Sequence, residues 1–121
     1  MIQVKRVYEP VAKTDGKRFL VDRLWPRGVK KEALHLEAWL KESAPSDNLR
    51  RWFKHEPAKW KEFQKRYRGE LTKHPQHFQL LIEAATNGSL TLLFGAHDTE
   101  HNNAVVLRDF LNEQIQPSKK T

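Results

Sequence analysis

The 121-residue sequence contains no cysteine, and this absence removes several classes of chemistry at once. Disulfide bonds, thiolate metal sites and cysteine nucleophiles are all excluded. A chain without cysteine also suits a reducing compartment, so we expect a cytoplasmic protein. No stretch has the length and apolar character of a membrane span, and the opening residues MIQVKRVYEP lack the apolar run of a signal peptide. We therefore predict a soluble protein that does not contact the membrane.

Internal repeats and low-complexity segments are absent as well, and the chain is short enough to form one domain. Hydrophobic residues make up 38% of the sequence and four of them are tryptophan, which is typical of a globular protein with a real core. The last residues, PSKKT, have no apolar side chain to pack. We predict a single domain over residues 1–116 and a disordered tail over residues 117–121.

Positive charge is concentrated in one segment. The formal net charge is +7, and residues 50–73 contain nine Lys or Arg and three Glu, an excess of six positive charges. Such a concentration attracts anions, including nucleic acids. We consider a nucleic-acid surface here, and the alternative interpretation is an ordinary solvated helix face. The candidate surface residues are Arg51, Lys54, Lys61, Lys65 and Arg68.

Runs of apolar residues alternate along the chain between strand and helix periods. Strand-like runs occupy residues 2–7, 18–25 and 89–96. Helical spacing occurs in residues 30–43, 46–53, 57–71, 75–87 and the segment that ends at Ile115. This alternation predicts a small α/β domain, with a short, largely parallel sheet flanked by helices on both faces.

Particular residues mark where these elements begin and end. Ser46 is a candidate N-cap, and Pro57 suits the first position of a helix. Asn87 and Gly88 read as a helix C-terminus, and the Asp15-Gly16 pair predicts a turn.

Two polar segments directly follow predicted strands: DRLWPRG at residues 22–28 and GAHDTEHNN at residues 95–103. Ligands of open parallel sheets bind beyond the carboxyl ends of the strands. If the two strands are neighbours, these segments form one crevice, in which arginine suits carboxylate or phosphate and a helix N-terminus attracts negative charge. The converging residues would be Asp22, Arg23, Arg27, His97, Asp98, His101, Asn102 and Asn103.

Within this crevice we expect Asp22 to orient Arg23 or Arg27, so that a guanidinium faces a space capped by Trp25 and Pro26. Pro26 keeps Trp25 extended. A plainer interpretation pairs Asp22 with the arginines only to fix the loop.

Other candidate residues also have structural interpretations. Asp98 and Asn102 suit N-caps, and Trp25 suits a packed wall. His97 and His101 are spaced by four residues, but no cluster of acidic ligands accompanies them. We predict no metal site and no cofactor.

Several long stretches resemble the YeaO-like proteins, a bacterial family of unknown function. The similarity runs from Val4 to Leu111 and rests on VYEP, DGKRFLVDRLWPRGVKKE, WLKESAPSDNLRRWFKHEPAKWKEFQKRYRGEL and TLLFGAHDTEHNNAVVL. The resemblance nominates as site residues Asp22, Arg23, Trp25, Pro26, Arg27, Gly28, Ser46, Arg50, Trp52, Phe53, His55, Tyr67, Gly95 and Asn103. More distant relatives carry a cysteine and a Cys-His-Arg triplet where this chain has Phe94-Gly95-Ala96 and His101-Asn102-Asn103.

Three functions follow from these patterns. The first is recognition of a small anionic or phosphorylated ligand, with Trp25, Arg50 and His55 added to the crevice residues. An enzyme that acts on a phosphorylated small molecule or nucleotide is one form of this function, although no motif specifies a reaction. The alternative is a nucleic-acid-binding accessory protein that uses the basic segment. The third is a protein that binds a protein partner through exposed tryptophan and arginine.

Overall fold

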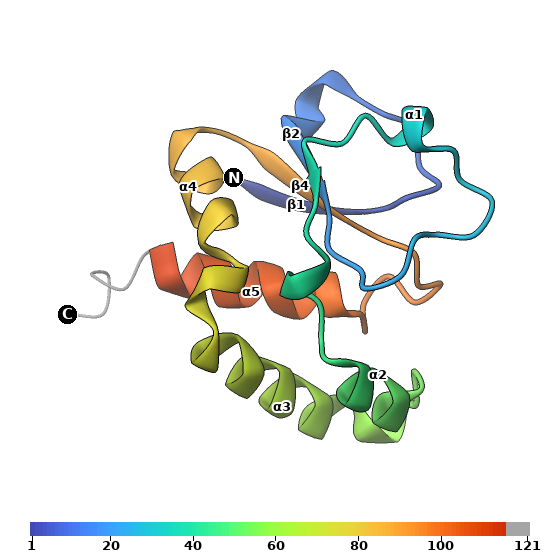
Figure 1. Cartoon of the computed structure of the whole chain (residues 1–121), viewed down its shortest axis with the longest axis vertical. Helices are drawn as coiled ribbons and strands as arrows, with labels where there is room; N and C mark the ends of the chain where they lie inside the picture. Colours follow the sequence, from blue (N-terminus) through green and yellow to red (C-terminus); the bar gives the residue numbers. More distant parts are fainter. Residues whose placement is uncertain (116–121) are drawn as a thin grey trace.

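Four short strands form one parallel sheet in the computed structural model, which describes residues 1–115 (Figure 1). The strands are β1 (Ile2–Arg6), β2 (Lys17–Leu20), β3 (Ala38–Trp39) and β4 (Leu90–Phe94), in the spatial order β1-β4-β2-β3. β4 pairs with both β1 and β2 in parallel. The predicted α/β class with a parallel sheet is therefore confirmed, and the expected tail over residues 117–121 lies outside the described residues.

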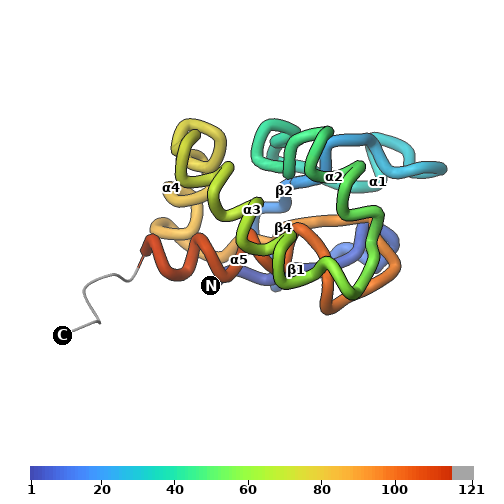
Figure 2. The backbone as a smooth tube through the Cα atoms, turned by 90° about the horizontal axis from the view of Figure 1, so that it is seen from below, coloured from blue at the N-terminus to red at the C-terminus, as the bar shows by residue number. Residues whose placement is uncertain are grey.

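The described residues form five α-helices: α1 (Lys31–Leu34), α2 (Asp47–Phe53), α3 (Trp60–Lys73), α4 (Gln79–Asn87) and α5 (Asn103–Ile115). One-turn 3-10 helices occupy Lys13–Asp15, Lys41–Ser43, Pro57–Lys59 and Pro75–His77. Figure 2 shows the same chain from a second direction. In residues 1–115 no helix has the length and hydrophobicity that crossing a membrane requires.

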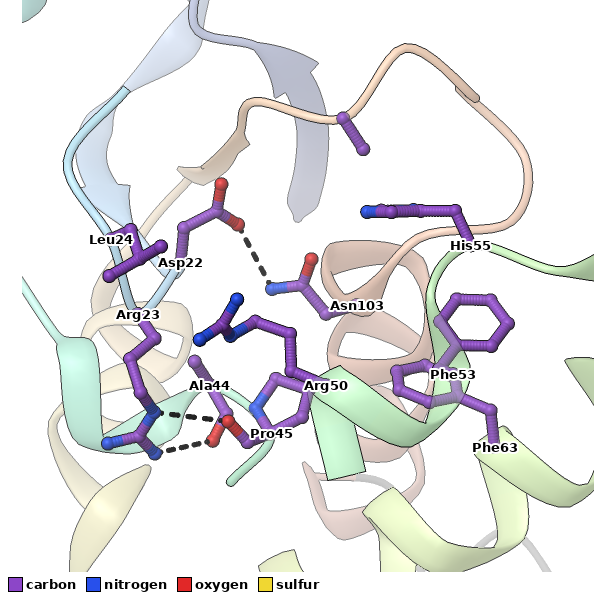
Figure 3. A pocket seen from close by; sticks show the side chains of 11 residues that line it. Asp22, Arg23, Leu24, Ala44, Pro45, Arg50, Phe53, His55, Phe63 and Asn103 are labelled. Carbon is purple, nitrogen blue, oxygen red and sulfur yellow. Dashed lines mark hydrogen bonds between the residues drawn. The ribbon is translucent and has the colours of Figure 1, made fainter. Parts of the chain in front are cut away.

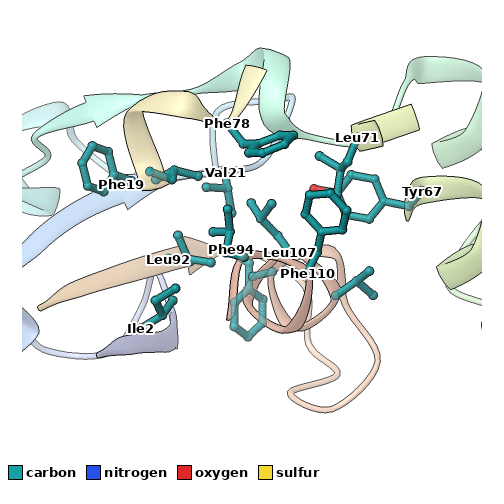
Figure 4. Close-up of a cluster of buried hydrophobic side chains, with 14 of the residues drawn as sticks. Ile2, Phe19, Val21, Tyr67, Leu71, Phe78, Leu92, Phe94, Leu107 and Phe110 are labelled. Carbon is teal, nitrogen blue, oxygen red and sulfur yellow. The ribbon is translucent and has the colours of Figure 1, made fainter. Parts of the chain in front are cut away.

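The main core lies between one face of the sheet and the four longer helices. Leu90, Leu92 and Phe94 alternate along β4 and point to this face, as the period of two in a strand requires. The predicted apolar stripe of α3 is buried in the same core through Tyr67 and Leu71, which lie beside α5 (Figure 4). Burial of this stripe packs α3 against α2 and α5 and leaves the basic side chains Lys61, Lys65 and Arg66 exposed.

A smaller set of side chains packs on the opposite face of the sheet. Leu20 and Leu93 pack there with Leu34 of α1 and with Trp25 and Trp39. The expectation of helices on both faces therefore holds only in reduced form. The connection from β2 to β3 spans residues 21–37, and it crosses this face with a single turn of helix.

A buried ionic cluster completes this second face. Asp15 accepts a hydrogen bond from Arg18 Nη1 and one from Lys5 Nζ at 3.0 Å. Asp15 and Arg18 are 1% and 4% exposed. Charges so deeply buried need partners of opposite sign, and Asp15 and Arg18 are such partners for each other.

The predicted helix over residues 30–43 is only partly confirmed, because a single turn, α1, forms at its start and a strand interrupts the rest. Helix α1 ends at Leu34, since His35 takes a left-handed conformation with φ of 48°. Trp39, expected on a helical face, lies in β3 opposite Leu20. Backbone pairing with β2 outweighs the local helical spacing, because it gives the edge strand partners for its polar groups.

The predicted helix boundaries are largely confirmed. Ser46 Oγ accepts a hydrogen bond from the Leu49 N–H at 3.2 Å and so caps α2. Pro57 opens the 3-10 turn that runs into α3, and Gly88 follows directly after α4.

Candidate functional site

A cavity of about 210 Å³ opens at the carboxyl ends of β2 and β4 (Figure 3). These two strands are neighbours in the sheet, so the segments that follow them meet, as the sequence predicts. Helix α2 and the start of α5 supply the other walls. The lining residues are Asp22, Arg23, Leu24, Ala44, Pro45, Arg50, Phe53, His55, Phe63, Ala96 and Asn103.

Asp22 ties together three parts of the site. Its Oδ2 accepts a hydrogen bond from the Gly95 N–H at 2.8 Å, and its Oδ1 accepts one from Asn103 Nδ2 at 3.2 Å. Asn103 also donates to the carbonyl of Val21 at 3.0 Å. The structure therefore gives Asp22 different partners from the expected Arg23 and Arg27: it links β2 to β4 and to the first residue of α5.

The environment of Asp22 favours its neutral form. Burial raises the pKa of this carboxyl above its usual value, and the bonds from Gly95 and Asn103, with the nearby His55, offset only part of the shift. Asp22 therefore keeps its proton to a higher pH than an exposed aspartate does.

Arg23 is anchored by the backbone on the opposite wall. Its Nε donates to the carbonyl of Pro45 at 3.1 Å and its Nη2 donates to the carbonyl of Ala44 at 3.2 Å. Glu42 and Asp47 lie 3.8 and 3.9 Å from its guanidinium. These contacts hold the Arg23 charge in a fixed position at the cavity.

Arg50 of α2 reaches into the space between Asp22 and Arg23 (Figure 3). Its Nη2 donates to Asp47 Oδ1 at 3.1 Å, and its Nε is shielded from solvent with no hydrogen-bond partner in the described part of the chain. Within residues 1–115, Nη1 donates to no protein atom. The side chain is 40% exposed. Part of this guanidinium is therefore open to a ligand.

His55 stands at the mouth of the cavity because the chain makes an unusual turn after α2. Lys54 and His55 both have left-handed backbones, with φ of 48° and 56°. Two such residues in succession without glycine are uncommon. The turn brings the His55 ring within 5.7 Å of the Phe53 ring centroid.

Residues from α3 hold the wall formed by Ala44 and Pro45. The Tyr67 hydroxyl donates to the carbonyl of Ser43 at 2.6 Å. The Glu70 carboxylate accepts hydrogen bonds from the N–H and the hydroxyl of Ser46, at 2.8 and 2.6 Å. Burial raises the pKa of Tyr67 well above its usual value, so its hydroxyl remains a donor. Ser46 and Tyr67 were nominated by the family resemblance. They hold the cavity wall in place but do not line the cavity.

Trp25 and Arg27 lie outside the cavity, and the expectation that Trp25 and Pro26 cap it is wrong. Trp25 packs edge-on against Trp39 at 5.3 Å and donates to the carbonyl of Val29 at 2.7 Å, on the second face of the sheet. The Arg27 side chain is exposed, and its carbonyl accepts a hydrogen bond from Tyr8. Trp25 fits the packed-wall interpretation, because its large ring is better buried than solvated.

Polar side chains of the loop before α5 form hydrogen bonds within the loop and to the start of α5. Asp98 accepts hydrogen bonds from the N–H groups of Glu100 and His101 and pairs with the His101 ring at 3.0 Å. The buried Asn102 accepts from the Val105 N–H at 3.0 Å and caps α5. His97 is exposed. The N-cap interpretation of Asn102 is confirmed.

The same loop offers no metal site. The His101 ring meets the Trp60 ring edge-on at 5.0 Å. Over residues 1–115, no group of three His, Asp or Glu side chains could hold a metal ion.

The basic residues of the predicted nucleic-acid surface differ in how free their charges are. Arg51, Lys54, Lys61 and Lys65 are exposed. Arg68 forms a two-pronged ion pair with Glu113 of α5, at 2.9 and 3.1 Å. The Arg68 charge therefore serves the contact between two helices.

Trp52, also nominated by the resemblance, lies beside this basic surface. Lys59 and Arg66 contact its ring at 5.0 and 4.2 Å from the centroid. Such contacts stabilise the outer side of α2 and α3.

The sequence prediction missed most of the apolar lining. Leu24, Ala44, Pro45, Phe63 and Ala96 were not among the candidate site residues. Apolar residues carry little sign of whether they face a core or a cavity, so only the tertiary arrangement reveals them.

The sequence of this chain matches a family model along its whole length. The family is described as the "Inactive DUF488-N3 subclade", and the match covers residues 1–121. The chain belongs to this family. Among similar proteins, the uncharacterized protein YeaO of Escherichia coli is 47% identical over 110 residues, which cover 91% of this chain and 96% of YeaO. The predicted YeaO-like family is thereby confirmed.

A more distant relative is the uncharacterized protein Mb3100c of Mycobacterium bovis. It is 37% identical over 112 residues, which cover 92% of this chain and 93% of that protein. No solved structure matches the chain.

Proposed function

We propose that the cavity at the carboxyl ends of β2 and β4 binds a small anionic ligand. The observation that carries this proposal is the guanidinium of Arg50, which lines the cavity and leaves Nη1 without a protein partner in the described part of the chain. The fixed guanidinium of Arg23 lines the same space. Arginine presents several donors in one plane and so suits an oxygen anion.

Recognition of the ligand, without chemical conversion, fits the remaining observations best. The family description uses the word inactive. The chain has no cysteine, so no thiol can act in the cavity. Asp22, the carboxyl in the cavity, is held by Gly95 and Asn103.

Thermal unfolding in a panel of anions tests the proposal. Acetate, benzoate, phosphate and a nucleoside monophosphate are each compared with sodium chloride at equal ionic strength, because a protein of net charge +7 responds to salt in general. A ligand at about ten times its Kd stabilises by about 1.4 kcal/mol, which corresponds to a rise in Tm of about 5 °C.

Arg50→Ala is expected to abolish this rise. Arg51→Ala is the matched control, since Arg51 lies on the same helix, bonds to Asn48 three residues earlier and does not line the cavity. If no anion stabilises the protein, or if both variants respond like the wild type, the proposal is wrong.

A second candidate function is nucleic-acid binding through the outer surface of α3. The observation that favours it is the exposure of Lys61 and Lys65, spaced by four residues and without ion pairs among residues 1–115. The pairing of Arg66 with Glu62 and of Arg68 with Glu113 removes two of the charges that such a surface would use. We therefore rank it below the anion site.

A further inference from the structure

Among residues 1–115, the cavity offers a ligand one guanidinium edge without a protein partner, that of Arg50. Arg23 and Arg50 supply two positive charges, and Asp47 lies 3.9 Å from the first and 3.1 Å from the second. Glu42 lies 3.8 Å from Arg23. A doubly charged phosphate on Arg50 would therefore lie close to the Asp47 carboxylate, which already partners both arginines, and like charges at such range repel.

The walls of the cavity are largely apolar. Six of its eleven lining residues have hydrocarbon side chains, namely Leu24, Ala44, Pro45, Phe53, Phe63 and Ala96. Leu24, which lines the cavity, is 59% exposed. A ligand with a hydrocarbon part would cover this side chain and remove apolar surface from water.

The size of the cavity limits the ligand. A volume of about 210 Å³ lies below the roughly 300 Å³ at which pockets for larger ligands begin. One aromatic ring or a short alkyl chain with a single acidic group fits this space.

We propose that the ligand is a small monocarboxylate with an aromatic or aliphatic body, bound with its carboxylate on Arg50 and its hydrocarbon part against Leu24 and the Ala44–Pro45 wall. This assignment rests on the proposed anion site and narrows it. It separates the ligand from inorganic phosphate, from nucleotides and from very small carboxylates, which lack either the single charge or the apolar part.

Calorimetric titration of the full chain with five probes tests the assignment. Benzoate carries both features, acetate lacks the apolar body, benzyl alcohol lacks the charge, and phosphate and a nucleoside monophosphate carry additional charge. We expect benzoate to bind about tenfold more tightly than acetate or phosphate, because one ring is buried. Benzyl alcohol is expected not to bind measurably.

Two variants locate the binding. Leu24→Ser, at a largely exposed position, is expected to weaken benzoate binding about fivefold and to leave acetate unchanged. Arg50→Ala is expected to remove binding of both, and Arg51→Ala to remove neither.

The results distinguish a failure of the monocarboxylate assignment from a failure of the anion site. If phosphate or the nucleoside monophosphate binds as tightly as benzoate in an Arg50-dependent manner, the anion site stands and the monocarboxylate assignment is overturned. If benzoate binds no better than acetate, or binds equally to Arg50→Ala, the assignment is likewise overturned. If no probe binds, the proposed function fails and the assignment fails with it.

Discussion

At the scale of single residues, Asp22 both connects secondary-structure elements and lines the cavity. Its carboxyl joins the end of β4 to the first residue of α5 and forms part of the cavity. Burial raises its pKa despite these two hydrogen bonds and the nearby His55. The folded protein therefore binds this proton more readily than the unfolded chain, in which the usual value of 3.8 applies.

This difference predicts how stability depends on pH. The contribution of Asp22 to the free energy of unfolding is fully present below the unfolded value of 3.8 and is lost as pH rises through the higher folded value. Asp22→Asn lacks this titration. We expect the free energy of unfolding of the wild type to decrease relative to that of Asp22→Asn as pH rises from about 3 to about 7, measured by urea unfolding. If the wild type instead gains stability relative to Asp22→Asn as pH rises, Asp22 is stabilised as the carboxylate.

At the scale of elements, the turn before β2 depends on one glycine. Gly16 has φ of 63° and ψ of −141°, a region that residues with side chains avoid. A Cβ at this position would also lie 2.2 Å from the carbonyl oxygen of Ser89. The turn therefore needs glycine for its backbone and for its close approach to the start of β4.

Substitution of this glycine is expected to be severe. Gly16→Ala adds backbone strain and a clash with backbone that cannot easily move, and we expect a loss of about 3 kcal/mol or more in the free energy of unfolding. Gly28→Ala is the matched control: Gly28 has φ of 75°, and nothing lies within 4 Å of the added Cβ. Strain alone is expected to cost about 1 kcal/mol there. Equal losses in urea unfolding would mean that the close approach to Ser89 is relieved by a shift.

The elements differ in how far the sequence predicts them. Tyr67 and Leu71 of α3 recur at helical spacing and are buried as expected. The two-residue strand β3 has no period of its own. This strand forms only by pairing with β2. The Leu40 N–H donates to the Leu20 carbonyl at 2.8 Å, and the Glu37 N–H donates to the Arg18 carbonyl at 2.7 Å. Local spacing cannot reveal such an element, because its polar groups are satisfied by residues far away in the sequence.

At the scale of the whole molecule, the parallel order of the strands made part of the site predictable. All carboxyl ends lie at one edge, so Asp22, Arg23 and Asn103 meet there. The face to which each loop turns was not predictable. Trp25 follows Asp22 by three residues yet packs on the other face of the sheet, while Ala44 and Pro45 arrive at the cavity from the connection after β3. Such choices depend on how the loops pack.

The distribution of charge over the whole molecule supplies the last prediction. If the exposed Lys61 and Lys65 form a nucleic-acid surface, Lys61→Glu/Lys65→Glu should weaken binding of a labelled oligonucleotide far more than Lys13→Glu/Lys30→Glu, whose residues are exposed elsewhere. Each pair of substitutions replaces two positive charges with two negative ones and lowers the formal net charge from +7 to +3. Fluorescence anisotropy at several salt concentrations measures the affinities.

The wild-type affinity is expected to fall steeply with salt, with a log–log slope of about −0.9 for each phosphate contacted on a duplex. If both double variants weaken binding equally, the attraction comes from overall charge and α3 is not a specific surface. If the wild type does not bind at low salt, where such contacts are strongest, the nucleic-acid function is excluded, because screening can only weaken the attraction further.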